Sequence, residues 1–279
     1  MFNSANVGII YNPSNAKTSD IVKQLMSTLG MDGSAWVIST SELTTVAPPP
    51  SMSLIITVGG DGTILAATQI AAPMGIPILG VNLGRIGFMT ELSANEASDK
   101  IYNYLSGDVR IETRSMLQAS LYDNDIVQSG GVYQALNDIV VGRSWISRPV
   151  HLQVSVDGSV VTTYRSDAVI VATATGSTGY SISVGGPILD PESRNILVNP
   201  VAPHMGLSST LILQENSRVD ITVKSDLKAV MSVDGRIDLD VNNGQTVSIS
   251  RSPHTARFLR ANPTHHFYSV LTDRLNPGT

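Results

Sequence analysis

The stretch of this sequence best suited to chemistry is Gly59-Gly60-Asp61-Gly62-Thr63. Glycines let backbone N–H groups come close to a phosphate, and the N-terminus of a following helix adds positive potential. Asp61 is poorly suited to binding phosphate directly, but a carboxylate there can hold a metal ion or accept a proton from a hydroxyl. Asp-Gly is also a common turn dipeptide, so the bare motif leaves a purely structural role for Asp61 open.

The surrounding elements are expected to place this motif at the end of a buried strand. Residues 54–58 form an unbroken apolar and β-branched run, typical of a parallel strand covered on both faces. A helix is expected from about Thr63 to Ala72, with Thr63 as its N-cap. Because ligands of open α/β sheets bind beyond the carboxyl ends of the strands, the motif is expected to face a ligand.

Three further stretches contain residue types suited to binding a nucleotide. Phe88 offers a flat face for a ring, although in isolation the favoured interpretation is a buried loop phenylalanine. Asn137-Asp138 places an amide beside a carboxylate, which suits a ribose or an adenine edge, although the pair alone favours a polar strand start. Residues 173–187 follow an expected strand at 168–172 and form a long loop rich in glycine and hydroxyl residues. That length and composition favour binding over a surface connection.

The pattern of elements changes along the chain. Strands at 7–11, 54–58 and 76–82 alternate with helices at 18–29, 63–72 and 93–105, which indicates parallel βαβ units. From about Arg114 to Ile249, short alternating runs are broken by turns such as Asp157-Gly158, which indicates antiparallel β-structure. Residues 258–275 are expected to form a helix that returns to the first domain. We therefore predict an α/β plus all-β protein, with a Rossmann-like domain at 1–112 joined by 255–279 and a β-sandwich domain at 113–254.

Composition limits the classes of function. The chain has 279 residues, of which 42% are hydrophobic, so a sizeable core is available and disorder is not expected. Its net charge is −5 with no basic block, which argues against a nucleic-acid or membrane-surface partner. There are no cysteines, so disulfides and thiolate metal sites are excluded. With neither a signal-peptide pattern nor a spanning apolar run, a soluble, cytoplasmic protein is expected.

The motifs together resemble those of the NAD kinases, which phosphorylate the 2′-hydroxyl of the adenosine ribose of NAD. The motif at 59–63 is shared with diacylglycerol and sphingosine kinases, and loosely with 6-phosphofructokinases. Segments more specific to NAD kinases follow in matching order, so the resemblance extends from residue 54 to about residue 240. These segments are 83–91, 137–138, 167–187, 199–204 and 233–236.

This resemblance implies roles for individual residues. Asp61 matches the aspartate that activates the ribose hydroxyl, while Gly59, Gly60 and Thr63 are expected to form the loop for the phosphate donor. Phe88 matches an aromatic residue of the adenine pocket, and Asn137 matches the first residue of an Asn-Glu pair that contacts NAD. The full set expected to bind NAD is Asp61, Gly62, Phe88, Asn137, Asp138, Arg148, Arg165, Asp167, Thr178, Gly179, Tyr180, Ser181, Ile182, Ser183, Ala202 and Arg236.

Several positions depart from the family pattern. Asp138 stands where relatives usually have glutamate, which shortens the reach by one methylene. Ala168 stands in place of a usual glycine and Ala174 in place of a proline. Arg236 stands where glutamine is frequent, and an arginine there could favour an additional phosphate. None of these changes removes Asp61 or the glycine-rich loops.

The resemblance also implies substrates and partners. NAD and ATP are the expected substrates, with Mg²⁺ carried on the phosphates of the donor rather than held in a dedicated metal site. Another triphosphate or polyphosphate could replace ATP as donor. Relatives are homodimers or homotetramers, so a homo-oligomer is expected. Two alternatives remain: a non-catalytic regulatory protein that binds NAD(P), and a lipid kinase, against which the segment 173–187 argues.

Overall fold

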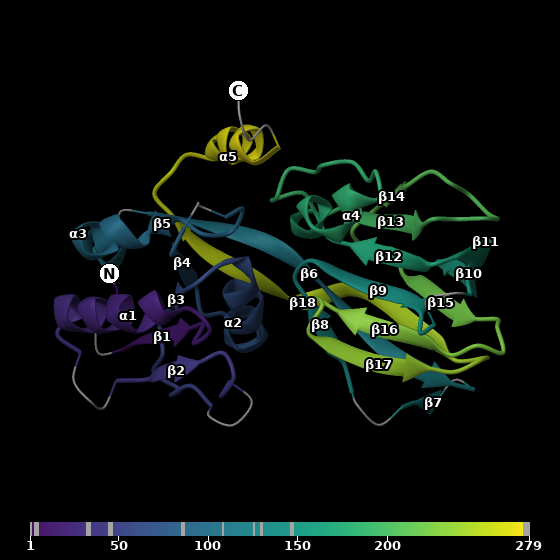
Figure 1. Ribbon diagram of the computed structural model, residues 1–279, viewed down its shortest axis with the longest axis horizontal. Helices are drawn as coiled ribbons and strands as arrows, with labels where there is room; N and C mark the ends of the chain where they lie inside the picture. Colours follow the sequence, from purple (N-terminus) through teal and green to yellow (C-terminus); the bar gives the residue numbers. More distant parts are fainter. Residues whose placement is uncertain are drawn as a thin grey trace. The chain divides into compact units, whose positions relative to one another are not determined.

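The computed structural model describes residues 2, 6–31, 35–43, 47–84, 87–107, 109–124, 126–128, 131–145 and 148–275. The chain divides into two compact units, Met1–Thr113 with Ala256–Thr279, and Arg114–Thr255 (Figure 1). The division falls within the long strands β6 (Arg110–Asp123) and β18 (Thr246–Arg260). Each unit is therefore built from segments that are distant in sequence.

The first unit is an α/β structure. Its strands run parallel in the order β18-β4-β3-β1-β2, and β5 pairs with β4. Its other elements are β1 (Val7–Tyr11), α1 (Ala16–Leu29), β2 (Val37–Ser39), β3 (Leu54–Val58), α2 (Asp61–Met74), β4 (Ile78–Asn82), β5 (Leu92–Ser93), α3 (Ala94–Leu105) and α5 (His266–Leu275).

Helices cover both faces of this parallel sheet. Every residue of β3 and β4 is buried, as expected for strands without a solvent-facing side. Alternate strand residues such as Ile56 and Leu79 form one apolar cluster with residues of α1 and α3. On the opposite face of β4, a Cβ added to Gly80 would lie 2.9 Å from Cδ1 of Ile64 in α2. The close packing of α2 fixes the turn that precedes it.

The second unit is rich in antiparallel strands. One sheet has the order β14-β13-β12-β9-β16-β17; in the other, β11, β10, β15 and β18 follow one another and β6 pairs with β18, β7 and β8. The remaining elements are β7 (Ile126–Val127), β8 (Tyr133–Ala135), β9 (Asp138–Arg143), β10 (Val150–Val156), β11 (Ser159–Ser166), β12 (Ala168–Ala172), η2 (Thr175–Thr178), α4 (Tyr180–Ser183), β13 (Ile196–Val201), β14 (Leu211–Leu213), β15 (Val219–Val223), β16 (Ala229–Val233) and β17 (Ile237–Val241).

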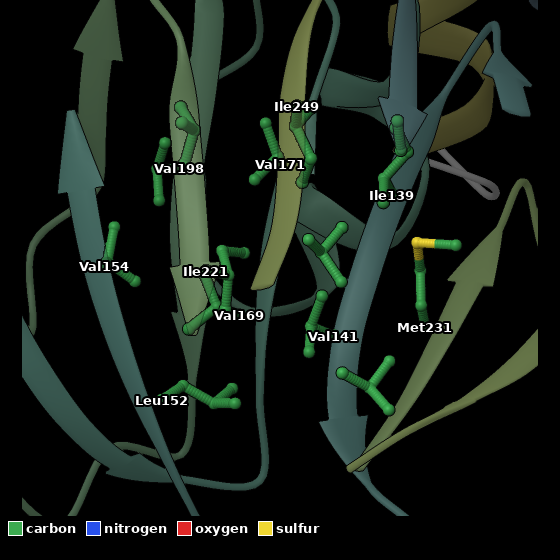
Figure 2. Close-up of a cluster of buried hydrophobic side chains, with 14 of the residues drawn as sticks. Ile139, Val141, Leu152, Val154, Val169, Val171, Val198, Ile221, Met231 and Ile249 are labelled. Carbon is green, nitrogen blue, oxygen red and sulfur yellow. The ribbon is translucent and has the colours of Figure 1, made fainter. Parts of the chain in front are cut away.

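The core of the second unit lies between the two sheets. Leu152 and Ile221 from one sheet pack with Val141, Val169 and other buried residues from the other (Figure 2). Burial of inward-facing aliphatic side chains from both layers defines a β-sandwich. The predicted combination of an α/β unit and a β-sandwich is therefore confirmed.

Three local predictions differ from the structure. Helix α2 begins at Asp61 with Gly60 as N-cap, so Thr63 is not the cap; instead, its buried side chain occupies the space beside Gly59. Strand β18 continues to Arg260, so the terminal helix begins at His266 rather than Phe258. The segment 173–187 is not one open loop, because it contains the short helical turns η2 and α4, and Thr175, Gly176 and Ser177 are buried.

Candidate active site

The turn between β3 and α2 requires glycine at its first position. Gly59 has φ +156°, and a Cβ there would lie 2.2 Å from Oγ1 of Thr63. The Gly59 N–H donates to the Val81 carbonyl at 2.9 Å, which holds the turn beside β4. Apart from the adjoining backbone, no atom of the described residues lies within 4 Å of a Cβ built on Gly60 or Gly62. Within the part of the chain that the structure describes, the start of α2 therefore leaves open space into which a phosphate could fit.

Asp61 is bound by the loop that follows β4. Its Oδ2 accepts from the Phe88 N–H and its Oδ1 from the Met89 N–H, each at 3.3 Å. A Cβ on Gly87 would lie 2.2 Å from Asp61 Oδ1, so only glycine lets the carboxylate approach this closely. The side chain is half-buried. Two backbone donors thus orient an acidic group at the carboxyl end of β3, as a proton acceptor requires.

The aromatic ring of Phe88 packs within the same unit. Its centroid lies 6.1 Å from that of Phe267 in α5, and the Arg274 guanidinium lies 5.1 Å from it. These contacts fall in the range of aromatic-pair and cation–π interactions. The terminal helix therefore supports the residue whose N–H binds Asp61. The neighbouring residues Arg85 and Ile86, part of the sequence motif, lie outside the described residues.

In the second unit, Asn137 and Asp138 lie against the glycine-rich segment. The Thr173 N–H donates to the Asn137 carbonyl at 2.9 Å, and Thr173 Oγ1 donates to the Leu136 carbonyl at 2.6 Å. A Cβ on Gly176 would lie 2.1 Å from the Asn137 carbonyl oxygen. A Cβ on Gly179 would lie 3.7 Å from both Asn137 Nδ2 and Asp138 Oδ2. The structure thus brings together two of the stretches singled out in the sequence.

Two buried oxygens beside these contacts have no hydrogen-bond partner among the described residues. They are Oδ1 of Asn137 and Oγ1 of Thr175. Leaving such polar atoms unpaired costs free energy, so each calls for an explanation, and a ligand that binds here would supply the missing partners. Thr175 did not stand out in the sequence, because its neighbours have the same small, polar character.

Asp234 holds the backbone around Asn137 in place, and it was not among the expected site residues. Its carboxylate accepts from the N–H groups of Leu136 and Asn137 at 2.8 Å and of Asp138 at 3.1 Å. Burial, and then the negative charge of Asp234, raise the pKa of Asp138 to about 7. Arg236 follows in the same turn, and its charge acts on Asp234. Asp234-Gly235 reads locally as an ordinary turn, so only the fold reveals this role.

The rest of the glycine-rich segment is ordered by a second set of contacts. Asn199 of β13 donates from Nδ2 to Ser181 Oγ at 2.7 Å, and a Cβ on Gly186 would lie 2.3 Å from that oxygen. Tyr180 is 44% exposed and Ser183 is exposed, whereas Thr178, Gly179 and Ile182 are half-buried. Tyr180 is therefore available to stack on a ring.

Other expected site residues gather at the opposite end of β9 and β12. Asp138 pairs with Ala172 and Gly142 pairs with Ala168, so the two ends are about 13 Å apart. Asp167 forms an ion pair with Arg143 at 3.0 Å, and its N–H donates to the Val201 carbonyl. Ala202 is exposed with φ +45°, and Arg165 and Arg148 are also exposed. The expected residues of this unit thus form two groups rather than one cluster.

Within the described ranges, His, Asp and Glu side chains do not gather in threes in a way that could hold a metal ion. In that same part of the chain, helices are too short or too polar to cross a membrane.

Comparison with known proteins agrees with this geometry. A model of the ATP-NAD kinase N-terminal domain matches residues 40–109, and one of the ATP-NAD kinase C-terminal domain matches residues 136–261. The NAD kinase of Dehalococcoides mccartyi strain CBDB1 is 40% identical over 275 residues, covering 96% of this chain and 95% of that protein. The NAD kinase of Chloroflexus aggregans is 36% identical over 271 residues, covering 96% of this chain and 98% of that protein.

Solved structures show the same fold. The crystal structure of yeast NADH kinase complexed with NADH has a TM-score of 0.83 at 24% identity, covering 97% of this chain and 88% of that one. The NAD kinase from Archaeoglobus fulgidus in complex with ATP has a TM-score of 0.72 at 25% identity, covering 95% and 98%. Fold and sequence together define a phosphotransferase whose acceptor is an alcohol. The chain belongs to the NAD kinase family.

Proposed function

We propose that this chain transfers the γ-phosphoryl group of ATP to the 2′-hydroxyl of the adenosine ribose of NAD, with Asp61 as the general base. The observation that supports this most directly is the Asp61 carboxylate. It lies at the start of α2, is held by two backbone N–H groups, and adjoins Gly60 and Gly62, whose side-chain positions no other described residue fills. The Archaeoglobus relative was solved with ATP and the yeast relative with NADH, which agrees with a nucleoside triphosphate donor and a dinucleotide acceptor.

In the proposed step, Asp61 accepts the proton of the ribose hydroxyl as that oxygen attacks the γ-phosphorus. A P–O bond forms, the bond to the β–γ bridging oxygen breaks, and ADP leaves with the electron pair. Gly59, Gly60 and Thr63 belong to the turn that would hold the donor phosphates, aided by the positive end of α2. Positioning and charge neutralisation supply most of the rate in phosphoryl transfer, and the base contributes about 10²–10⁴-fold.

The second unit supplies the proposed NAD-binding groups. Asn137 and Asp138 offer an amide and a carboxyl group beside the Thr175 hydroxyl, which no described residue binds, and this set suits the polar edge of a nucleoside. Tyr180 would stack on a ring. Thr178, Gly179, Ser181, Ile182 and Ser183 belong to the same segment, and Arg236 adjoins Asp234. For Gly62, Phe88, Arg148, Arg165, Asp167 and Ala202, contact with NAD stays a prediction.

Mg²⁺ is proposed to enter on the donor phosphates. Asp61 is the one carboxylate in the turn at 59–63, so the chain offers at most a single charged ligand there. Magnesium keeps several waters and binds through one or two carboxylates plus substrate phosphates, which fits this donor set. When bound, the ion would neutralise phosphate charge. A cytoplasmic location and a homodimer or homotetramer also stay predictions; light scattering after size exclusion measures the latter.

One assay tests the proposal. Purified protein is incubated with NAD, ATP and Mg²⁺, and product is read with an NADP-specific dehydrogenase. The expected result is NADP formation without added lipid, which a lipid kinase would not give. Replacing ATP by inorganic polyphosphate identifies the donor. No NADP with either donor, from protein that still binds NAD by calorimetry, would favour the non-catalytic alternative.

A further inference from the structure

A buried ionic cluster lies beneath the loop that binds Asp61. It consists of Arg260 at the end of β18, Glu91 next to β5, and Glu112 in β6, all in the first unit. The side chains of these three residues are only 6%, 2% and 7% exposed. Burying charges is costly even when they are paired, and apolar residues of similar size often serve stability as well. A cluster of this kind therefore calls for an explanation beyond stability.

Glu91 is the fixed centre of the cluster. Its Oε1 accepts from the Tyr104 hydroxyl at 3.1 Å, from the Ala261 N–H at 2.9 Å, and from both the N–H and Nδ2 of Asn262 at 3.1 Å. Burial, and then the negative charge of Glu91, raise the pKa of Tyr104 well above its usual range, so its hydroxyl stays protonated as a donor. The other carboxylate oxygen of Glu91, Oε2, accepts from Arg260 at 3.2 Å.

Arg260 uses its planar fork to join three acceptors. Nη1 donates to Glu91 Oε2 and, at 3.0 Å, to the Met89 carbonyl. Nε and Nη2 donate to Glu112 Oε1 at 3.3 and 3.1 Å. A guanidinium held on both edges by carboxylates has little rotational freedom. The Met89 carbonyl is thus bound by a donor whose own position is fixed.

Met89 connects this cluster to Asp61. Its carbonyl accepts from Arg260, and its N–H donates to Asp61 Oδ1. The peptide units around this residue therefore lie between a fixed cation and the proposed general base. If Met89 shifted, its hydrogen bond to Asp61 would lengthen, and the Asp61 carboxylate would rotate or lose this donor.

We propose that Arg260 is a positioning residue for catalysis, acting through Met89 to orient the Asp61 carboxylate. This inference rests on the proposed role of Asp61 as base. Arg260 is not proposed to touch substrate. Glu91 and Glu112 hold its guanidinium in place, and the guanidinium in turn fixes the Met89 peptide that binds Asp61.

The test is a double-mutant cycle of Arg260→Lys and Asp61→Asn. Lysine keeps the positive charge but lacks the planar guanidinium, whose several N–H groups bind the Met89 carbonyl and two carboxylates at once. We expect R260K to lower kcat by about 10- to 100-fold, since misplacing a reacting group by about 1 Å costs up to about 10²-fold. KM for NAD and for ATP should change by less than about twofold, because the binding groups are untouched. In the D61N background, R260K should change kcat by less than about twofold.

The matched control is Arg110→Lys. Arg110 borders the cluster rather than belonging to it. It donates to Glu112 Oε2 at 3.2 Å and to the Asn262 carbonyl, not to the Glu112 Oε1 that binds Arg260, so R110K tests loss of ionic packing at Glu112. We expect it to lower the thermal midpoint while leaving kcat within about twofold of wild type. If R260K does not accumulate as folded protein, the cycle is run with Glu112→Gln, which is expected to lower kcat by about 3- to 10-fold.

The outcomes separate two failures. If D61N keeps wild-type turnover, the proposed base is wrong. If D61N is impaired but R260K or E112Q lowers kcat by the same factor in both backgrounds, the positioning role is wrong and the base stands. A rise in KM with unchanged kcat also contradicts positioning.

Discussion

Gly176→Ala should disrupt the proposed NAD site by steric conflict between two backbone segments. A Cβ at this position would lie 2.1 Å from the Asn137 carbonyl oxygen and 2.6 Å from its carbon, whereas ordinary contact begins at 3.4 Å. One segment must therefore move by about 1.3 Å, the difference between those separations. Both belong to backbone, so no side-chain rotation relieves the conflict. The substitution should separate η2 from Asn137.

The cost follows from the bonds that hold these segments together. Thr173 donates to the Asn137 and Leu136 carbonyls, and the Gly176 N–H donates to Thr173 Oγ1 at 3.1 Å. Overpacking costs about 1–3 kcal/mol, and each lost hydrogen bond about 1 kcal/mol. With two of these three bonds lost, the free energy of unfolding should fall by about 3–5 kcal/mol. Misplacement by about 1 Å should lower kcat/KM by about 10²-fold.

Urea unfolding, calorimetric titration with NAD and the coupled kinase assay measure these effects. Gly84→Ala is the stability control, because a Cβ on Gly84 meets no atom of another described residue within 4 Å and its φ lies outside the left-handed region. The free energy of unfolding of G84A should lie within about 1 kcal/mol of that of wild type. A G176A protein with wild-type stability and wild-type affinity for NAD would refute the claim that this close approach builds the site.

Two further predictions concern the carboxyl groups of the second unit. Because the pKa of Asp138 rises from 3.8 when unfolded to about 7 when folded, the folded state binds more protons between these values, so wild-type stability should fall as pH rises from 4 to 7. Asp138→Asn should lessen this fall, which urea unfolding across that range measures, while Asp234, whose pKa burial also raises, keeps part of it. An unchanged slope would assign the whole dependence to other groups. Asp167→Asn breaks an ion pair whose side chains are 28% and 30% exposed, so stability should change by at most about 1 kcal/mol. If Asp167 binds NAD, calorimetry should nevertheless show at least about tenfold weaker binding, and unchanged affinity would remove it from the site.

Much of the fold could be predicted because its signals are local. The buried run at 54–58 and the Asp157-Gly158 turn depend on neighbours in sequence, and the structure has β3 and the β10–β11 hairpin there. The end of β18 and the start of α2 were predicted wrongly. Phe258 lies in a strand because it pairs with Ile78 in β4, and that pairing overrides local helical character.

The less predictable parts of the site depend on contacts between distant residues. Asp234 binds the N–H of Asn137 across 97 positions, and Arg260 binds Glu91 across 169 positions. In sequence, Asp234 belongs to an ordinary turn and Arg260 to the segment 258–275 that was expected to form a helix, so neither carries a local signal for its role. Asp61 could be selected because the glycines around it have a recognisable chemical purpose, whereas its tether to Phe88 and Met89 required the fold.

The turnover number of Asp61→Asn at saturating NAD, ATP and Mg²⁺ decides whether Asp61 is the general base. Asparagine preserves the shape of the side chain but cannot accept the hydroxyl proton as a carboxylate does. The account predicts a folded protein that still binds NAD and whose kcat is lower by about 10²–10⁴-fold. A folded D61N protein that forms NADP at close to the wild-type rate would contradict it.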